Sequence, residues 1–263
     1  KSSKKPIAAF FCFGNMRYVI LPIVLTLCWA SPLAAQQSKS FIVRTGDIIL
    51  NRVPLPDRYR FDEFKDARVY FANNTSASGK LNYHFLYAEM QFVDVTGDTV
   101  SLANEHMIRR ISFKDLDYFY DSEKADYLEV VLDGPLLILA KKQELRLLEY
   151  DVKAMEGYVS SLTPELSRAI FDLDNQVHPE NLRELLHSRA TNPLLICPHE
   201  ALFFIDRNHV VHPARKASLR KIFPDFRREI SDYLGENKIS FSSKKDLSEL
   251  VTFCNQLSLQ SQY

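Results

Sequence analysis

Residues 81–92 read Leu-Asn-Tyr-His-Phe-Leu-Tyr-Ala-Glu-Met-Gln-Phe, and this stretch decides the fold. Within it, residues 82–85 and 90–92 alternate polar and apolar side chains, which is the period of a half-buried β-strand. Asp-Val-Thr-Gly-Asp follows at 94–98 and precedes a further strand-like run at 99–102. Gly97 supplies the positive φ that a tight hairpin requires, so the stretch predicts consecutive antiparallel strands.

The same pattern continues on both sides of this stretch, from Ala67 to about Glu149. Four more strands are predicted, at Arg110–Phe113, Asp117–Tyr120, Tyr127–Leu132 and Leu136–Ala140. The last of these is apolar on both faces, which is typical of a central or doubly covered strand. Short strands with frequent turns predict an antiparallel β-meander over residues 36–150 that curls into a half-barrel or a sandwich.

Residues 151–192 lack this regularity and are interpreted as a variable connection with short helices. Thr163 followed by Pro164 is a plausible helix start, because threonine caps helices well and proline is tolerated at the first helical position. Residues 179–187 form a second candidate helix, with Leu182, Leu185 and Leu186 on one face.

Regular structure is predicted again in residues 193–263. Leu202–Ile205 and His209–Val211, separated by Asp-Arg-Asn, indicate a β-hairpin. Helices are predicted at Asp225–Leu234 and from Ser243 to about Leu257, the second starting with Ser243 and Asp246 in capping-box spacing. The fold class is therefore α+β: an N-terminal antiparallel meander followed by a hairpin and C-terminal helices.

Several segments resemble uncharacterised secreted proteins of Bacteroidetes-type bacteria. These are residues 81–92 and 97–104, together with Lys-Ile-Phe-Pro-Asp at 221–225 and the residues behind it up to Leu247. The resemblance covers roughly residues 41–150 and 201–257. It implies secretion, but it carries over no activity and no site residues.

The N-terminal region has the order of a secretory signal peptide. Met16-Arg17 precedes an apolar run at 18–29, and small residues and glutamines follow, with Ala35 at the expected cleavage position. Residues 1–15 are then an upstream extension, and residues 1–35 lie outside the mature fold. We expect an exported protein, periplasmic or associated with the outer membrane, that is not an integral membrane protein after cleavage. The alternative is that the apolar run remains as an uncleaved membrane anchor. The run is short for a bilayer span and contains prolines, which argues against this alternative.

Charge and glycine content exclude two classes of partner. Cleavage after Ala35 leaves 29 basic and 33 acidic side chains, an acidic balance that argues against a nucleic-acid partner. The pairs Lys141-Lys142 and Arg227-Arg228 are interpreted as solvated faces. The chain has seven glycines and none are clustered, so no nucleotide-binding loop can form.

Cysteine and histidine offer one weak metal candidate, formed by Cys197, His199, His209 and His212. A three-residue offset would place His209 and His212 on opposite faces of a shared strand, and the spacing matches no structural zinc site. We therefore predict no metal and no cofactor. Cys197 and Cys254 could form one disulfide in an exported protein, or remain two thiols beside apolar residues, and the sequence leaves both open.

Aromatic side chains offer the remaining candidate site. Tyr83, Tyr118 and Tyr120 lie in predicted strands and could form an exposed binding face, although tyrosine is also common in strands for packing reasons alone. No pair of carboxylates stands out, so no catalytic residue is predicted. The sequence favours a non-enzymatic binding or structural module of the cell envelope, whose partner is an envelope protein or a glycan. The alternative is a hydrolase of an envelope polymer, with an acid or histidine site assembled from distant segments.

Overall fold

The computed structural model describes residues 39–150, 170–172 and 179–260. The predicted signal peptide and the helix expected from Thr163 lie outside these residues. The strands are β1 (Phe41–Val43), β2 (Lys65–Phe71), β3 (Ser76–His84), β4 (Glu89–Val93), β5 (Thr99–Ser101), β6 (Ile108–Ser112), β7 (Asp117–Asp121), β8 (Asp126–Leu132), β9 (Leu137–Tyr150), β10 (Ile170–Asp172), β11 (Leu194–Asp206) and β12 (Val211–Pro213). The helices are η1 (Leu50–Arg52), α1 (Leu55–Arg58), η2 (Glu105–Met107), α4 (Pro179–His187), α5 (Lys216–Ile222), α6 (Arg227–Asn237) and α7 (Lys244–Gln260).

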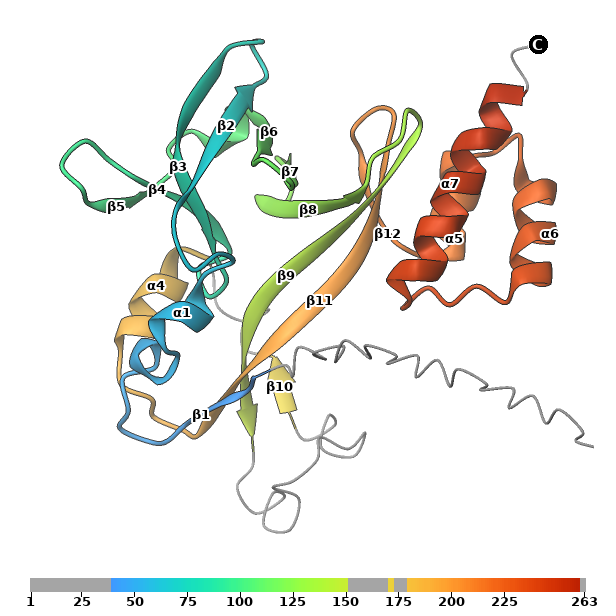
Figure 1. Ribbon diagram of the computed structural model, residues 1–263. Helices are drawn as coiled ribbons and strands as arrows, with labels where there is room; N and C mark the ends of the chain where they lie inside the picture. The colour runs from blue at the N-terminus through green and yellow to red at the C-terminus, as the bar shows by residue number, and fades with distance from the viewer. Residues whose placement is uncertain (1–38, 151–169, 173–178, 261–263) are drawn as a thin grey trace, which may run out of the picture. The chain divides into compact units, whose positions relative to one another are not determined.

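One antiparallel sheet organises these strands (Figure 1). Its order is β1-β11-β9-β8-β7-β6-β2-β3-β4-β5, with β10 paired to β9 and β12 paired to β11. All the pairings are antiparallel. The two ends of this order, β1 and β5, do not pair with each other, so the sheet is not closed into a barrel. The predicted α+β fold with an antiparallel meander is confirmed.

The longest pairing joins the two halves of the chain. β11 pairs with β9 along its whole length, from Leu194 opposite Glu149 to Asp206 opposite Leu137. Because β11 belongs to this sheet, the predicted hairpin extends the meander. The expected strand at 136–140 is too short, since β9 continues to Tyr150 through a run of charged residues.

Cross-strand ion pairs explain how β9 continues through these charges. Lys141 Nζ lies 2.9 Å from Glu129 Oε1, and both side chains are only 9% exposed. Lys142 Nζ lies 2.7 Å from Asp126 Oδ1. Glu129 also accepts a 2.9 Å hydrogen bond from Arg60, which precedes β2. Paired in this way, the charged side chains tolerate burial that unpaired charges would not.

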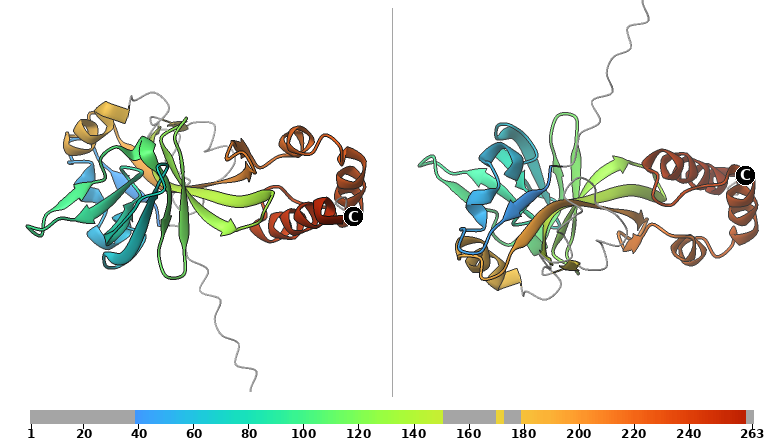
Figure 2. Two further views of the ribbon diagram at one scale, coloured as in Figure 1. Left: turned by 90° about the horizontal axis from the view of Figure 1, so that it is seen from above. Right: turned by 90° about the horizontal axis from the view of Figure 1, so that it is seen from below.

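The helices α5, α6 and α7 lie beside the tips of the β8–β9 and β11–β12 hairpins (Figure 2). Leu247, Leu250, Val251 and Cys254 of α7 are fully buried in the cluster that includes Leu137 and Phe204 of the sheet. Ser243 caps α7 as predicted, because its Oγ accepts from the Asp246 amide at 3.3 Å. The reciprocal bond of a capping box is not made, since the Ser243 amide donates to the Ser240 carbonyl and not to Asp246. α4 matches its predicted range, whereas the sequence pattern does not predict α5. Within the described residues, no helix combines the length and the apolar character needed to cross a membrane.

Candidate functional site

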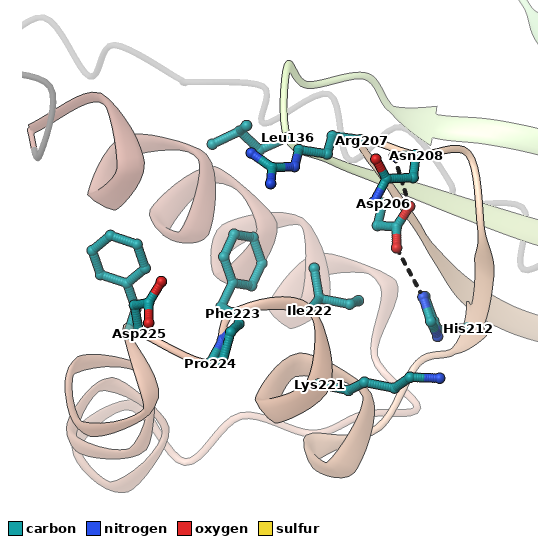
Figure 3. Close-up of a pocket in the computed structure, with 11 residues that line it drawn as sticks. Leu136, Asp206, Arg207, Asn208, His212, Lys221, Ile222, Phe223, Pro224 and Asp225 are labelled. Atoms are coloured by element: carbon teal, nitrogen blue, oxygen red, sulfur yellow. Dashed lines mark hydrogen bonds and ion pairs between the residues drawn. The ribbon is translucent and has the colours of Figure 1, made fainter.

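A cavity of about 440 Å³ lies between the β11–β12 turn and the segment that links α5 to α6 (Figure 3). Asp206, Arg207 and Asn208 line it from the turn, and His212 lines it from β12. Lys221 to Phe226 close the other side, and Leu136 reaches in from the β8–β9 loop. A volume of this size is typical of a site for a small molecule.

Asp206 builds the turn that forms one wall. Its Oδ1 accepts hydrogen bonds from the amides of Asn208 at 2.8 Å and Val210 at 3.0 Å. His209 adopts a left-handed conformation, with φ at +64°, which completes the turn. Burial opposes ionisation of Asp206, but these amides and His212 outweigh it and lower the pKa of its carboxyl group. Asp206 is therefore an anion with a fixed position.

The second carboxylate oxygen of Asp206 orients His212. Asp206 Oδ2 lies 3.1 Å from His212 Nε2, and the side chains are 14% and 10% exposed. An ionised carboxylate can only accept, so Nε2 carries the hydrogen and the neutral ring has its lone pair on Nδ1. No other hydrogen bond to the His212 side chain occurs among residues 39–150, 170–172 and 179–260. The arrangement presents an oriented imidazole at the cavity.

Two cations, the carboxylate of Asp225 and several apolar side chains complete the lining. Arg207 and Lys221 are exposed, and neither has a carboxylate within 4.0 Å in the part of the chain that the structure describes. Phe223 is buried and Phe226 half-buried, so the wall opposite the turn is largely apolar. The cavity thus combines two cations without an ion pair, two carboxylates and several apolar side chains.

This lining restricts the chemistry that the cavity can perform. The described residues around it include no serine, threonine, cysteine or tyrosine, so it offers none of these as a nucleophile. His212, held by Asp206, has the form of a general base acting on water. To bind a ligand with an anionic group, in contrast, the cavity needs only the cations that already line it.

The predicted metal candidates do not converge. His212 pairs in register with Phe204, and Cys197 and His199 lie further along β11, opposite Arg146 and Glu144. His209 lies in the turn, with its ring 5.8 Å from that of Phe119. The described residues contain no group of three or more His, Cys, Asp or Glu side chains that could hold a metal ion.

Cys197 and Cys254, the two cysteines among the described residues, also lie apart in the fold. Cys197 lies on β11, and Cys254 lies in the core between α7 and the sheet. Within the described part of the chain no disulfide joins them. Burial raises the pKa of the Cys254 thiol to about 12, so this group behaves as a small apolar side chain.

The interpretation of Tyr83, Tyr118 and Tyr120 as an exposed aromatic face is wrong. Their exposed fractions are 1%, 3% and 6%, and all three belong to one core cluster inside the curved sheet. Tyr83 stacks on Tyr118 with ring centroids 5.5 Å apart. The curvature of the sheet turns this face inward, so the rings pack against one another and cannot contact a partner.

Sequence patterns alone do not reveal the cavity. The aspartate and the histidine that meet across it are six residues apart, and their contact depends on the register of the β11–β12 turn. The spacing of His212 suggests only a metal ligand, and Asp206 has the pattern of an ordinary turn residue. The cations leave a readable signal, because Arg207 and Lys221 belong to a strongly basic stretch.

Comparisons with protein-family models, with curated proteins and with solved structures find no match to this chain. We therefore infer function from the cavity and its charges.

Proposed function

We propose that this chain is an exported cell-envelope protein that acts as a non-enzymatic binding module, with the Asp206–His212 cavity as its ligand site. The observation that carries the proposal is the lining: two cations without an ion-pair partner, Arg207 and Lys221, beside apolar side chains and the carboxylates Asp206 and Asp225, without a hydroxyl or thiol nucleophile among the described lining residues. Such a site stabilises a bound anion without a covalent step.

The size of the cavity favours one of the two partner classes. A volume of about 440 Å³ admits a small ligand or a unit of a polymer and excludes a folded protein. Arg207 and Lys221 favour an acidic group on that ligand. Of an envelope protein and a glycan, we therefore favour an envelope glycan with acidic sugar units.

Titration calorimetry with sodium glucuronate and with glucose tests this proposal. Glucuronate should bind and glucose should bind at least tenfold more weakly, because only the acid engages the cations. Lys221→Gln should weaken glucuronate binding about tenfold, because Lys221 is exposed and should contribute only the lower end of the about 1.5–3 kcal/mol of a hydrogen bond to a charged group. Lys80→Gln on β3, an exposed cation on the meander, is the matched control. Equal binding of the two sugars, or an unchanged affinity in Lys221→Gln, would rule out an acidic ligand.

Hydrolysis of an envelope polymer is the second candidate, and the pairing of His212 with Asp206 favours it. In such a reaction Nδ1 of His212 would take a proton from water while Asp206 holds the ring. His212→Gln separates the two functions, because it removes the base and keeps a polar side chain of comparable reach. Release of soluble fragments from purified envelope polymer by the natural chain, abolished in His212→Gln, would replace the binding proposal with an enzyme.

Export rests on the sequence pattern at residues 16–37. It predicts that the exported chain begins near Gln36, which N-terminal sequencing of the secreted protein measures. A mature chain that still carried Trp29 would contradict the cleavage.

A further inference from the structure

Positive charge in this chain is concentrated in one segment. Residues 207–228, called here the basic segment, hold seven basic side chains and one acid, although the whole chain has 33 of each. The segment covers the β11–β12 turn, α5 and the start of α6. All seven cations are exposed, and they are Arg207, Arg215, Lys216, Arg220, Lys221, Arg227 and Arg228.

The protein does not neutralise this charge. Of the seven cations, Arg228 alone has a carboxylate within 4.0 Å among the described residues, and that pair, with Asp232, is itself exposed. Some cations on the sheet are paired instead. Lys141 and Lys142 each have a carboxylate oxygen within 2.9 Å, and Arg110 lies 2.8 Å from Asp133. Six of the seven cations therefore have no ion pair with the described residues in the folded state.

Two of the cations stand where they oppose helix formation. α6 has 11 residues and begins with Arg227 and Arg228, and its N-cap residue, Phe226, makes no side-chain capping bond. The N-terminal end of a helix carries partial positive charge and favours acidic side chains. Glu229 in the same turn favours the helix, but the two arginines before it do not, which fits a positive surface available to an external anion.

We propose that the basic segment docks the protein onto an anionic phospholipid surface. The cations are spread over a turn and two helices, which suits a plane of many phosphate groups. Single-stranded nucleic acid would require exposed rings for base stacking, whereas Phe223 is buried and Phe226 half-buried. Among the exposed large apolar side chains of the described residues, Val210 is the one that lies in the segment, so attachment is electrostatic, without deep insertion.

This proposal rests on the proposed export, which brings the chain to a bacterial membrane surface, and it does not depend on the ligand of the cavity. Anionic membranes attract basic side chains by about 1 kcal/mol each, which corresponds to about a fivefold change in partitioning. Attraction of this kind is screened by salt over a Debye length of about 10 Å at 0.1 M.

Co-sedimentation of the purified chain with vesicles tests the proposal. Vesicles of phosphatidylglycerol and phosphatidylcholine in equal amounts should bind the chain at low salt, and vesicles of phosphatidylcholine alone should not. Rising salt should release it. The double substitution Arg227→Gln and Arg228→Gln should weaken binding about 25-fold, because two charges are removed. It leaves the cavity lining intact, so glucuronate binding should not change.

Lys80→Gln and Arg109→Gln, two exposed cations on the sheet, are the matched controls and should bind as the natural chain does. Circular dichroism should show unchanged helix content in every variant. Equal binding to both kinds of vesicle, no binding to either, or an unaffected double variant would overturn the proposal. Tighter binding to single-stranded DNA or polyphosphate at the same salt would replace the membrane with a soluble polyanion.

Discussion

Asn255 is expected to hold α7 against the sheet, and its replacement by alanine should be strongly destabilising. Its Oδ1 accepts hydrogen bonds from the amides of Leu136 and Leu137, both at 3.0 Å. Its Nδ2 donates to the carbonyls of Leu137 and Val251, both at 2.9 Å. The side chain is almost fully buried, so all its hydrogen-bonding capacity is used inside the protein.

The magnitude follows from the groups that Asn255→Ala would leave without partners. Each buried polar group that loses its partner costs about 1–3 kcal/mol, and the amides of Leu136 and Leu137 are left in this state. We therefore expect the free energy of unfolding to fall by about 2–5 kcal/mol. Asn237→Ala in α6 is the matched control, because Asn237 is exposed and donates one bond, to Tyr233 of its own helix. It should cost no more than about 0.5 kcal/mol.

Urea unfolding followed by circular dichroism measures both variants, provided that the slope against urea does not change between them. Similar losses of stability in the two variants would refute the reasoning. That result would mean that α7 is held by its apolar face alone and that the four hydrogen bonds contribute no net stability.

Three further predictions concern the same fold. Gly134→Ala should cost about 1–3 kcal/mol in a urea melt, because a Cβ there would clash with Asn255 Nδ2 and lie 2.7 Å from the Leu137 carbonyl oxygen; an unchanged midpoint would contradict this contact. Burial, together with two nearby arginines, lowers the pKa of His84 from 6.5 to about 3. The unfolded chain therefore binds a proton at His84 more readily than the folded chain does, and the stability that depends on the neutral ring is complete above pH 6.5. As the pH is lowered from 6.5 to 3, the free energy of unfolding should fall by about 1.4 kcal/mol per pH unit, and His84→Asn should remove this slope. Leu250→Ala should lower the free energy of unfolding by about 2–5 kcal/mol, because it leaves a cavity at a fully buried position. Ser243→Ala should lower it by about 1 kcal/mol, because α7 loses its cap. Equal costs in the two variants would argue against a packed α7.

The parts of the fold that could be predicted are those in which a short sequence pattern identifies the buried face of a single helix or strand. The apolar stripe of α7 and its capping serine are local in sequence, and so is the alternation at residues 82–85. The full length of β9 could not be predicted, because Lys141 and Lys142 interrupt its apolar pattern. Their partners lie on β8, and Glu129 also binds Arg60, 69 residues away along the chain. Periodicity alone cannot reveal such pairing.

The candidate site depends on details of tertiary structure. The tyrosines of the meander have the right composition for a binding face, but the curvature of the sheet makes them face inward. The link between Asp206 and His212 requires the left-handed turn at His209, which the residue type does not specify. The basic segment is different, because its excess of positive charge is visible from the residue types at 207–228 alone.

The central claim, that the cavity beside the β11–β12 turn binds an acidic ligand, is tested most directly by residue-resolved NMR. The chain is titrated with sodium glucuronate while the backbone amide resonances are followed. Saturable shifts should be centred on the residues that line the cavity, which are Leu136, residues 206–208, His212 and residues 221–226, and in Lys221→Gln they should require about tenfold more glucuronate. Shifts centred elsewhere on the sheet, or no saturable shifts at all, would contradict the account.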